Sequence, residues 1–212
     1  MQQRTSATGI QLQVMPAVGV IQRAVFSPLR TGEWHVGKQK LILLLINVIG
    51  GIAVIGSYIL GLSGDSGTDV LWGGVSESIR PVYAVSMVLS AIGYFAFLNL
   101  LLLRVDPKEV TVGRRFGYSI FYPIFVLILI PSAFWMPLTN LYVDDPSSGT
   151  WAGIRVVLFL VGLASIALAW ALFTLRPGNR GKAYWAAVVG SCYFAFHTFV
   201  LDAILWAALF QS

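Results

Sequence analysis

The chain has 212 residues, of which 57% are hydrophobic and 11% are charged, with a formal net charge of +5. A soluble domain carries about 25% charged residues, so this composition excludes a water-soluble globule. The surplus of basic residues does not indicate nucleic-acid binding, because these residues are distributed as the topology of a membrane protein requires.

Five stretches are long and apolar enough to cross a membrane, for which about 20 mostly apolar residues are needed. Backbone groups find no water partners in lipid, so each stretch is predicted to be a helix. The predicted fold class is an all-α, polytopic integral membrane protein with a bundle of five transmembrane helices. The predicted spans are residues 40–62, 81–103, 117–138, 152–175 and 184–210.

Residues 1–39 precede the first span and form a basic N-terminal tail. No apolar run of about 7–15 residues opens the sequence, so an ordinary signal peptide is not expected. Residues 14–26 are apolar with a single arginine, Arg23. Two interpretations stay open for this segment: an interfacial helix that lies on the membrane, or a tail that packs on the bundle.

The basic residues predict the orientation of the bundle. Twelve of the fourteen lysines and arginines lie in the tail, after the second span or after the fourth span. Arg80 and Arg155 fall on the other side, together with acidic residues such as Asp144 and Asp145. The positive-inside rule therefore places the N-terminus in the cytoplasm and the C-terminus outside. We expect a bacterial inner membrane or an organellar membrane.

The first span is rich in small residues, which permit close approach between helices. This approach is expected either within the bundle or across a homodimer. The small residues are Gly50, Gly51, Gly56, Ser57 and Gly61. In the connection that follows, Val70, Leu71 and Trp72 are too apolar for a free linker, so we expect it to fold over the outer mouth of the bundle.

The third span carries three prolines, Pro123, Pro131 and Pro137. Prolines kink helices, so this span is predicted to bend and to open space within the bundle. Trp135 and Asn140 lie near its outer end. Both are candidates for lining that space.

Asp202, in the fifth span, is the principal candidate for function. An ionisable group within a span costs a few kcal/mol and usually faces the bundle interior or a cavity. Asp202 lies eight residues before Phe210, about 12 Å along an α-helix, and Thr198 and Trp206 share its face. Two hypotheses stay open: an interhelical hydrogen bond, or a ligand or proton site.

His197 lies five residues before Asp202, which is roughly 140° around an α-helix. A His–Asp pair is therefore not expected, and His197 is interpreted as a residue bonded within the bundle. The only other histidine, His35, falls on the opposite side of the membrane by topology, so a metal site is not predicted. No catalytic residue is predicted either. Cys192, the only cysteine, is expected to be a small core residue.

Short motifs give the chain a resemblance to a known family. Trp135-Met136-Pro137 provides a Trp-x-Pro in the third span, and Leu201-Asp202 precedes Trp206 by four residues in the fifth. Pro81 and Tyr83 open the second span. With these motifs, residues 40–210 resemble the tryptophan-rich sensory protein family, which includes the translocator protein (the peripheral benzodiazepine receptor). The family has an asparagine where Asp202 stands and a tryptophan where Leu89 stands.

This resemblance implies binding of tetrapyrroles, sterols or similar apolar ligands within the bundle, usually in a dimer, and no settled enzymatic turnover. No cofactor follows from the residues themselves; a tetrapyrrole follows only from the resemblance. We predict that the protein binds a hydrophobic or amphipathic small molecule (a tetrapyrrole, sterol or lipid) in an intramembrane cavity open toward the outer side. The predicted lining residues are Tyr83, Trp135, Asn140, His197, Asp202 and Trp206. The alternatives are an accessory subunit of a larger membrane complex and an intramembrane enzyme that uses Asp202.

Overall fold

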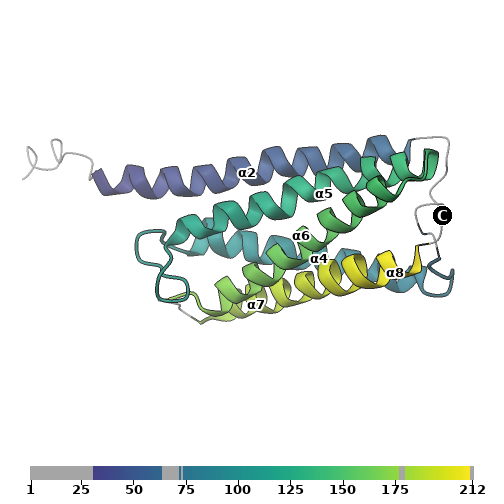
Figure 1. Cartoon of the computed structure of the whole chain (residues 1–212). Coiled ribbons are helices and arrows are strands. Elements are labelled where there is room, and N and C mark those ends of the chain that lie inside the picture. Colours follow the sequence, from purple (N-terminus) through teal and green to yellow (C-terminus); the bar gives the residue numbers. More distant parts are fainter. Residues whose placement is uncertain (1–30, 64–71, 73, 177–179, 211–212) are drawn as a thin grey trace, which may run out of the picture. The chain divides into compact units, whose positions relative to one another are not determined.

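Figure 1 shows the computed structural model of the chain, which describes residues 31–63, 72, 74–176 and 180–210. The chain divides into two units, Met1–His35 and Val36–Ser212. The predictions for residues 1–30, including the interfacial helix over 14–26, and those for Val70 and Leu71 lie outside the described residues.

The described residues hold five helices that are long and apolar enough to cross a membrane, and they form no extended strand. The all-α class and the five helices predicted from composition are therefore confirmed. The first three are α2 (Thr31–Leu62), α4 (Arg80–Asn99), which continues as the π-helix η1 (Leu100–Arg104), and α5 (Phe121–Asp144), which follows the 3₁₀ turn η2 (Tyr118–Ile120). The last two are α6 (Ser148–Phe173) and α7 (Lys182–Ala195), which continues as the π-helix η3 (Phe196–Trp206) and ends in α8 (Ala207–Leu209).

Two helices extend well beyond the predicted spans. α2 begins at Thr31 rather than near residue 40, and α5 continues to Asp144 rather than ending near 138. Hydropathy marks only the apolar run, whereas backbone hydrogen bonding continues through the polar residues beside it. Pro123 lies in the first turn of α5, where proline removes no intrahelical hydrogen bond. Only Pro131 and Pro137 lie inside the helix, so the expected interruption by three prolines is wrong for Pro123.

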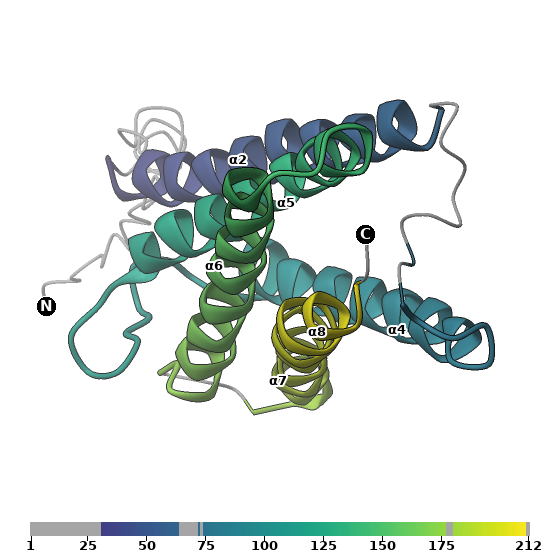
Figure 2. The ribbon, with the colours of Figure 1, turned by 45° about the vertical axis from the view of Figure 1, so that its right-hand side comes forward.

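Around the bundle, neighbouring helices follow the order α2, α5, α6, α7 and α4, and α4 also contacts α5 through Phe97 and Phe125, with 6.0 Å between their ring centres. Helix α5 packs on α6, α6 on α7 and η3, and α7 on α4. The Tyr94 hydroxyl of α4 donates a hydrogen bond to the Asn47 side chain of α2. Figures 1 and 2 agree that α2 runs beside α5.

Close helix approach depends on several glycines, among them Gly162 of α6, where a Cβ would lie 2.7 Å from the Phe199 side chain of η3. A Cβ at Gly50 would lie 2.7 Å from the Leu129 side chain of α5, and one at Gly61 would lie 2.2 Å from Met136. Gly51 and Gly56 have no such neighbour within 4 Å in the described part of the chain, so only half of these glycines of α2 pack against another described helix. Gly93 and Gly190 form a further close contact that the sequence did not indicate: a Cβ at Gly93 of α4 would lie 2.6 Å from the carbonyl oxygen of Gly190 in α7.

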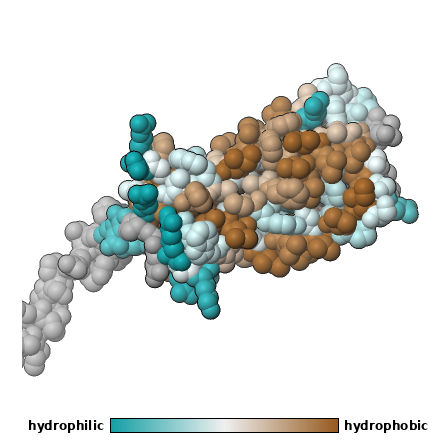
Figure 3. Space-filling model, turned by 90° about the horizontal axis from the view of Figure 1, so that it is seen from below, coloured by the Kyte–Doolittle hydropathy of each residue, from teal (hydrophilic) through white to brown (hydrophobic). Residues whose placement is uncertain are grey.

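Apolar side chains cover the middle of the bundle and hydrophilic ones gather at its ends, as Figure 3 shows for one face. The basic residues of the connections are brought together at one end, where Thr111 pairs with Arg176 through their backbones. Cys192 is exposed, so its predicted core position is wrong: it lies on the outward face of α7.

Buried apolar side chains form two clusters along the bundle. The larger contains Phe97, Phe121 and Phe125, all fully buried. The smaller, toward the α5–α6 connection, contains Ile154 and Trp206. The two clusters are separate, and a cavity lies between them, lined by side chains from both.

Candidate functional site

The fifth helix brings His197 and Asp202 together, contrary to the sequence prediction. His197 Nε2 lies 3.7 Å from Asp202 Oδ2. The prediction assumed an α-helix, but residues Phe196–Trp206 form a π-helix. Its hydrogen bonds join residues five apart, so residues 197 and 202 lie above one another. π-helical turns are rare and frequently occur at functional sites.

His197 is held from its other side by α4 and α7. Its Nδ1 lies 2.9 Å from the Ser86 hydroxyl oxygen, and the Tyr193 hydroxyl donates to that same oxygen over 3.1 Å. Because Ser86 already accepts from Tyr193, its own proton is free to be donated to Nδ1. In that arrangement Nε2 carries the ring proton and directs it toward Asp202.

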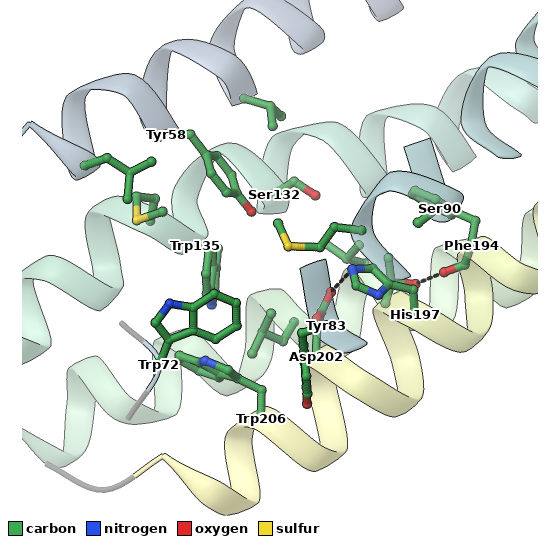
Figure 4. A pocket seen from close by; sticks show the side chains of 17 residues that line it. Tyr58, Trp72, Tyr83, Ser90, Ser132, Trp135, Phe194, His197, Asp202 and Trp206 are labelled. Carbon is green, nitrogen blue, oxygen red and sulfur yellow. Dashed lines mark hydrogen bonds and ion pairs between the residues drawn. The ribbon is translucent and has the colours of Figure 1, made fainter. Parts of the chain in front are cut away.

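A cavity of about 440 Å³ lies in front of this pair. It falls within the range of about 300–1,000 Å³ common for small-molecule sites. Figure 4 shows its lining side chains, with Asp202 and the histidine ring at its polar end. Every one of the five helices contributes to the lining, which consists of Val54, Tyr58, Leu62, Trp72, Tyr83, Met87, Ser90, Ser132, Trp135, Met136, Leu158, Val161, Phe194, His197, Thr198, Asp202 and Trp206.

Aromatic rings form much of the cavity wall. The Trp135 ring centre lies 5.6 Å from that of Tyr58 and 5.4 Å from that of Trp206. Trp72 comes from the connection after α2 and meets Tyr83 edge to face, with 6.2 Å between ring centres. At Trp72, therefore, this connection does cover the cavity. The indole nitrogen of Trp135 is buried and has no hydrogen-bond partner among the described residues.

Five of the six side chains predicted to line a cavity do so: Tyr83, Trp135, His197, Asp202 and Trp206. Asn140 does not. Its amide nitrogen donates to the carbonyl oxygen of Gly61 over 3.0 Å, so it joins α5 to α2. Its depth in the span was a valid indication, but its helix face turns it away from the cavity.

Two functional contacts were missed in the sequence. Ser86 gives no signal, because a lone serine in a span commonly bonds its own helix. Tyr58 lies among the small residues of α2, and its isolation as the one aromatic residue of that span could have marked it. Among the described residues, no group of three or more His, Cys, Asp or Glu side chains could hold a metal ion.

The arrangement has the chemical capacity for two tasks. It can surround an apolar body with aromatic faces, and it offers one carboxyl and one imidazole at the polar end. An acid–base role for Asp202 requires a second titratable group, which His197 supplies. Ser86 does not line the cavity, so its hydroxyl positions the imidazole and does not face a bound molecule.

No family model, curated protein or solved structure matches this chain. The resemblance to the tryptophan-rich sensory protein family therefore stays a prediction that rests on the motifs given above.

Removing the Ser86 hydroxyl is expected to destabilise the protein. Ser86→Ala leaves His197 Nδ1 and the Tyr193 hydroxyl without their shared partner, and an unsatisfied buried group costs about 1–3 kcal/mol. Ser90→Ala is the matched control, because Ser90 lies one turn away on α4, is equally buried and has no hydrogen-bond partner among the described residues. Thermal unfolding in detergent should separate the two variants; equal midpoints would contradict this role of Ser86.

Proposed function

We propose that this chain is an integral membrane protein that binds a hydrophobic or amphipathic small molecule in the cavity between its five helices. The observation that carries the proposal is the cavity itself, a space of about 440 Å³ walled by aromatic and aliphatic side chains with few polar groups. Such pockets occur between the helices of bundles, where a small number of polar groups fixes the orientation of the ligand.

The cavity favours this function over an accessory subunit of a larger complex. The subunit interpretation expected no cavity and expected Asp202 to contact another helix. Instead, the nearest described partner of Asp202 is His197, on its own helix, and the side chain of Asp202 is 33% exposed. The carboxyl group therefore faces free space within the bundle.

Ligand-induced stabilisation of the purified protein tests the proposal. The panel would contain haem, protoporphyrin, sterols and common lipids. A ligand at 100 times its Kd should add about 2.7 kcal/mol to the free energy of unfolding. Val54→Trp, which places bulk in the cavity from α2, should abolish this gain.

Val48→Trp provides the control for the cavity variant. Val48 lies on the same helix with 47% of its surface exposed, so the added indole ring meets only the surroundings of the bundle. The proposal fails if no compound stabilises the wild type, or if the two variants respond alike.

The proposed orientation places the basic end of the bundle in the cytoplasm, in accord with the positive-inside rule. In a Cys192→Ser background, Ser76→Cys should react with a membrane-impermeant maleimide from outside intact cells. Lys108→Cys, at the opposite end, should react only after permeabilisation. The reverse pattern would invert the topology.

A further inference from the structure

The charge of the cavity wall narrows the class of ligand. Among the described residues that line the cavity, Asp202 is the only aspartate or glutamate, and none is lysine or arginine. Arg80 does not line the cavity, although its guanidinium carbon lies 5.8 Å from the centre of the Trp72 ring. In the described part of the wall, a bound molecule therefore meets one carboxyl group and no lysine or arginine.

The carboxyl group of Asp202 has room for another partner. Its only ion-pair partner among the described residues is His197, whose Nε2 lies 3.7 Å away, beyond the usual N–H···O distance of about 2.7–3.2 Å. No described donor lies within hydrogen-bond distance of either carboxyl oxygen. A carboxylate within a membrane span is costly unless it is paired, and the side chain points into the cavity (Figure 4). The missing partner can therefore come from a ligand.

The aromatic wall suits the same kind of ligand. Faces of tryptophan and tyrosine rings attract cations within about 6 Å, and cages of such rings recognise quaternary ammonium groups. Trp72, Tyr83, Trp135 and Trp206 surround the cavity on the side next to Asp202. All four rings offer apolar contact area to the body of a ligand. Tyr83, Trp135 and Trp206 also offer favourable electrostatics to a cationic centre, whereas the Trp72 ring already faces Arg80.

Because Asp202 and the aromatic rings line the same cavity, we propose that it binds an organic cation with Asp202 as the counter-ion. The cation would be a protonated amine, a quaternary amine or a similar onium ion, carried on an apolar body. The inference rests on the proposed binding function and specifies its ligand class. It also predicts discrimination: an anionic ligand, such as a tetrapyrrole with free propionates, would bring its charge against the carboxylate.

Three probes of similar size and different charge test the inference: tetraphenylphosphonium, neutral triphenylphosphine oxide and tetraphenylborate. Binding to wild-type protein in an uncharged maltoside detergent is measured by quenching of tryptophan fluorescence, with empty micelles as blank. We expect the cation to bind at least tenfold more tightly than the neutral probe, and the anion more weakly than either. Equal Kd values for the cation and the neutral probe would overturn the proposal.

Variants assign the preference to Asp202. Asp202→Asn should remove the tenfold preference for the cation and keep the Kd of the neutral probe, which also reports that the variant is folded. Asp145→Asn, an exposed position at the end of α5, should change neither value. Survival of the preference in Asp202→Asn would overturn the assignment. If Asp202→Asn does not fold, the Kd values of the three probes for the wild-type protein still test whether the cavity prefers a cation.

The same measurements distinguish a failure of the cation preference from a failure of the proposed binding function. If no probe of any charge binds, the proposed binding function fails as well. Equal binding of the cation and the neutral probe would contradict only the preference for a cation and would leave the proposed binding function unchanged. A short-chain phosphatidylcholine should not displace tetraphenylphosphonium. Displacement would overturn a free organic cation in favour of a lipid headgroup.

Discussion

Replacing Trp206 with alanine should lower the free energy of unfolding by about 3–5 kcal/mol, the usual cost of deleting a buried tryptophan. Trp206 is only 5% exposed. Its ring centre lies 5.4 Å from that of Trp135, 6.3 Å from that of Trp151 and 4.7 Å from that of Phe210. One indole ring thus joins α5, α6 and the end of the last helix, and its loss leaves three neighbours without their contact.

Thermal unfolding in detergent would measure the effect. For a chain of this size, 1 kcal/mol shifts the Tm by about 2–4 °C, so Trp206→Ala should unfold roughly 6–20 °C below the wild type. Trp185→Ala is the matched control, because Trp185 is 47% exposed and its loss opens no comparable space. The role given to Trp206 would be wrong if both variants lost the same few degrees.

Gly93→Leu should be the most disruptive change on α4. A Cβ at residue 93 would lie 2.6 Å from the carbonyl oxygen of Gly190 and 3.0 Å from its Cα. No side chain can move aside, because the obstacle is backbone, so α4 and α7 must separate. Overpacking lowers the free energy of unfolding by about 1–3 kcal/mol and occasionally more. Because the obstacle is backbone, we expect the loss for Gly93→Leu to lie at the upper end of this range.

Separating α4 from α7 should also disturb the candidate site around His197. Ser86 lies on α4, whereas Tyr193 and His197 follow Gly190 on the last helix, so the Ser86–His197 hydrogen bond crosses the interface that the leucine would open. Gly51→Leu is the control, because nothing lies within 4 Å of a Cβ there and leucine is a better helix former than glycine by up to about 1 kcal/mol. We expect Gly93→Leu to lose both stability and ligand binding, and Gly51→Leu to keep both. Comparable losses in the two variants would mean that the Gly93–Gly190 contact is not the cause.

The fold class could be predicted because hydropathy over about 20 residues reports directly on a span. The position of Asp202 and Trp206 on one cavity also followed from the sequence, and both side chains do line it, although their helix is a π-helix and not the α-helix assumed. The contact between His197 and Asp202 could not be predicted, because nothing in their spacing distinguishes a π-helix from an α-helix. What stabilises the wider turn lies on other helices: Ser86 bonds His197, and the Tyr83 hydroxyl donates to the carbonyl oxygen of Leu201 over 2.9 Å.

Asn140 illustrates a second limit of sequence reasoning. Its polarity and depth indicated an inward position, and it does form a hydrogen bond between helices. Which neighbour it faces depends on how α5 is rotated against α2, and that rotation is determined by the close contacts at Gly50 and Gly61. Such contacts depend on pairs of residues about 80 positions apart in the chain, so no local pattern reveals them.

The π-helix also bears on how this site would look in another chain. Its hydrogen bonds span one residue more than those of an α-helix, so the five-residue step from His197 to Asp202 is equivalent to a four-residue step in an ordinary helix. A protein that lacks one residue between them would bring the same two side chains together with the spacing His-x-x-x-Asp. The two chains would then differ by a single-residue insertion in the middle of a membrane span, absorbed by widening one stretch of helix rather than by lengthening a loop.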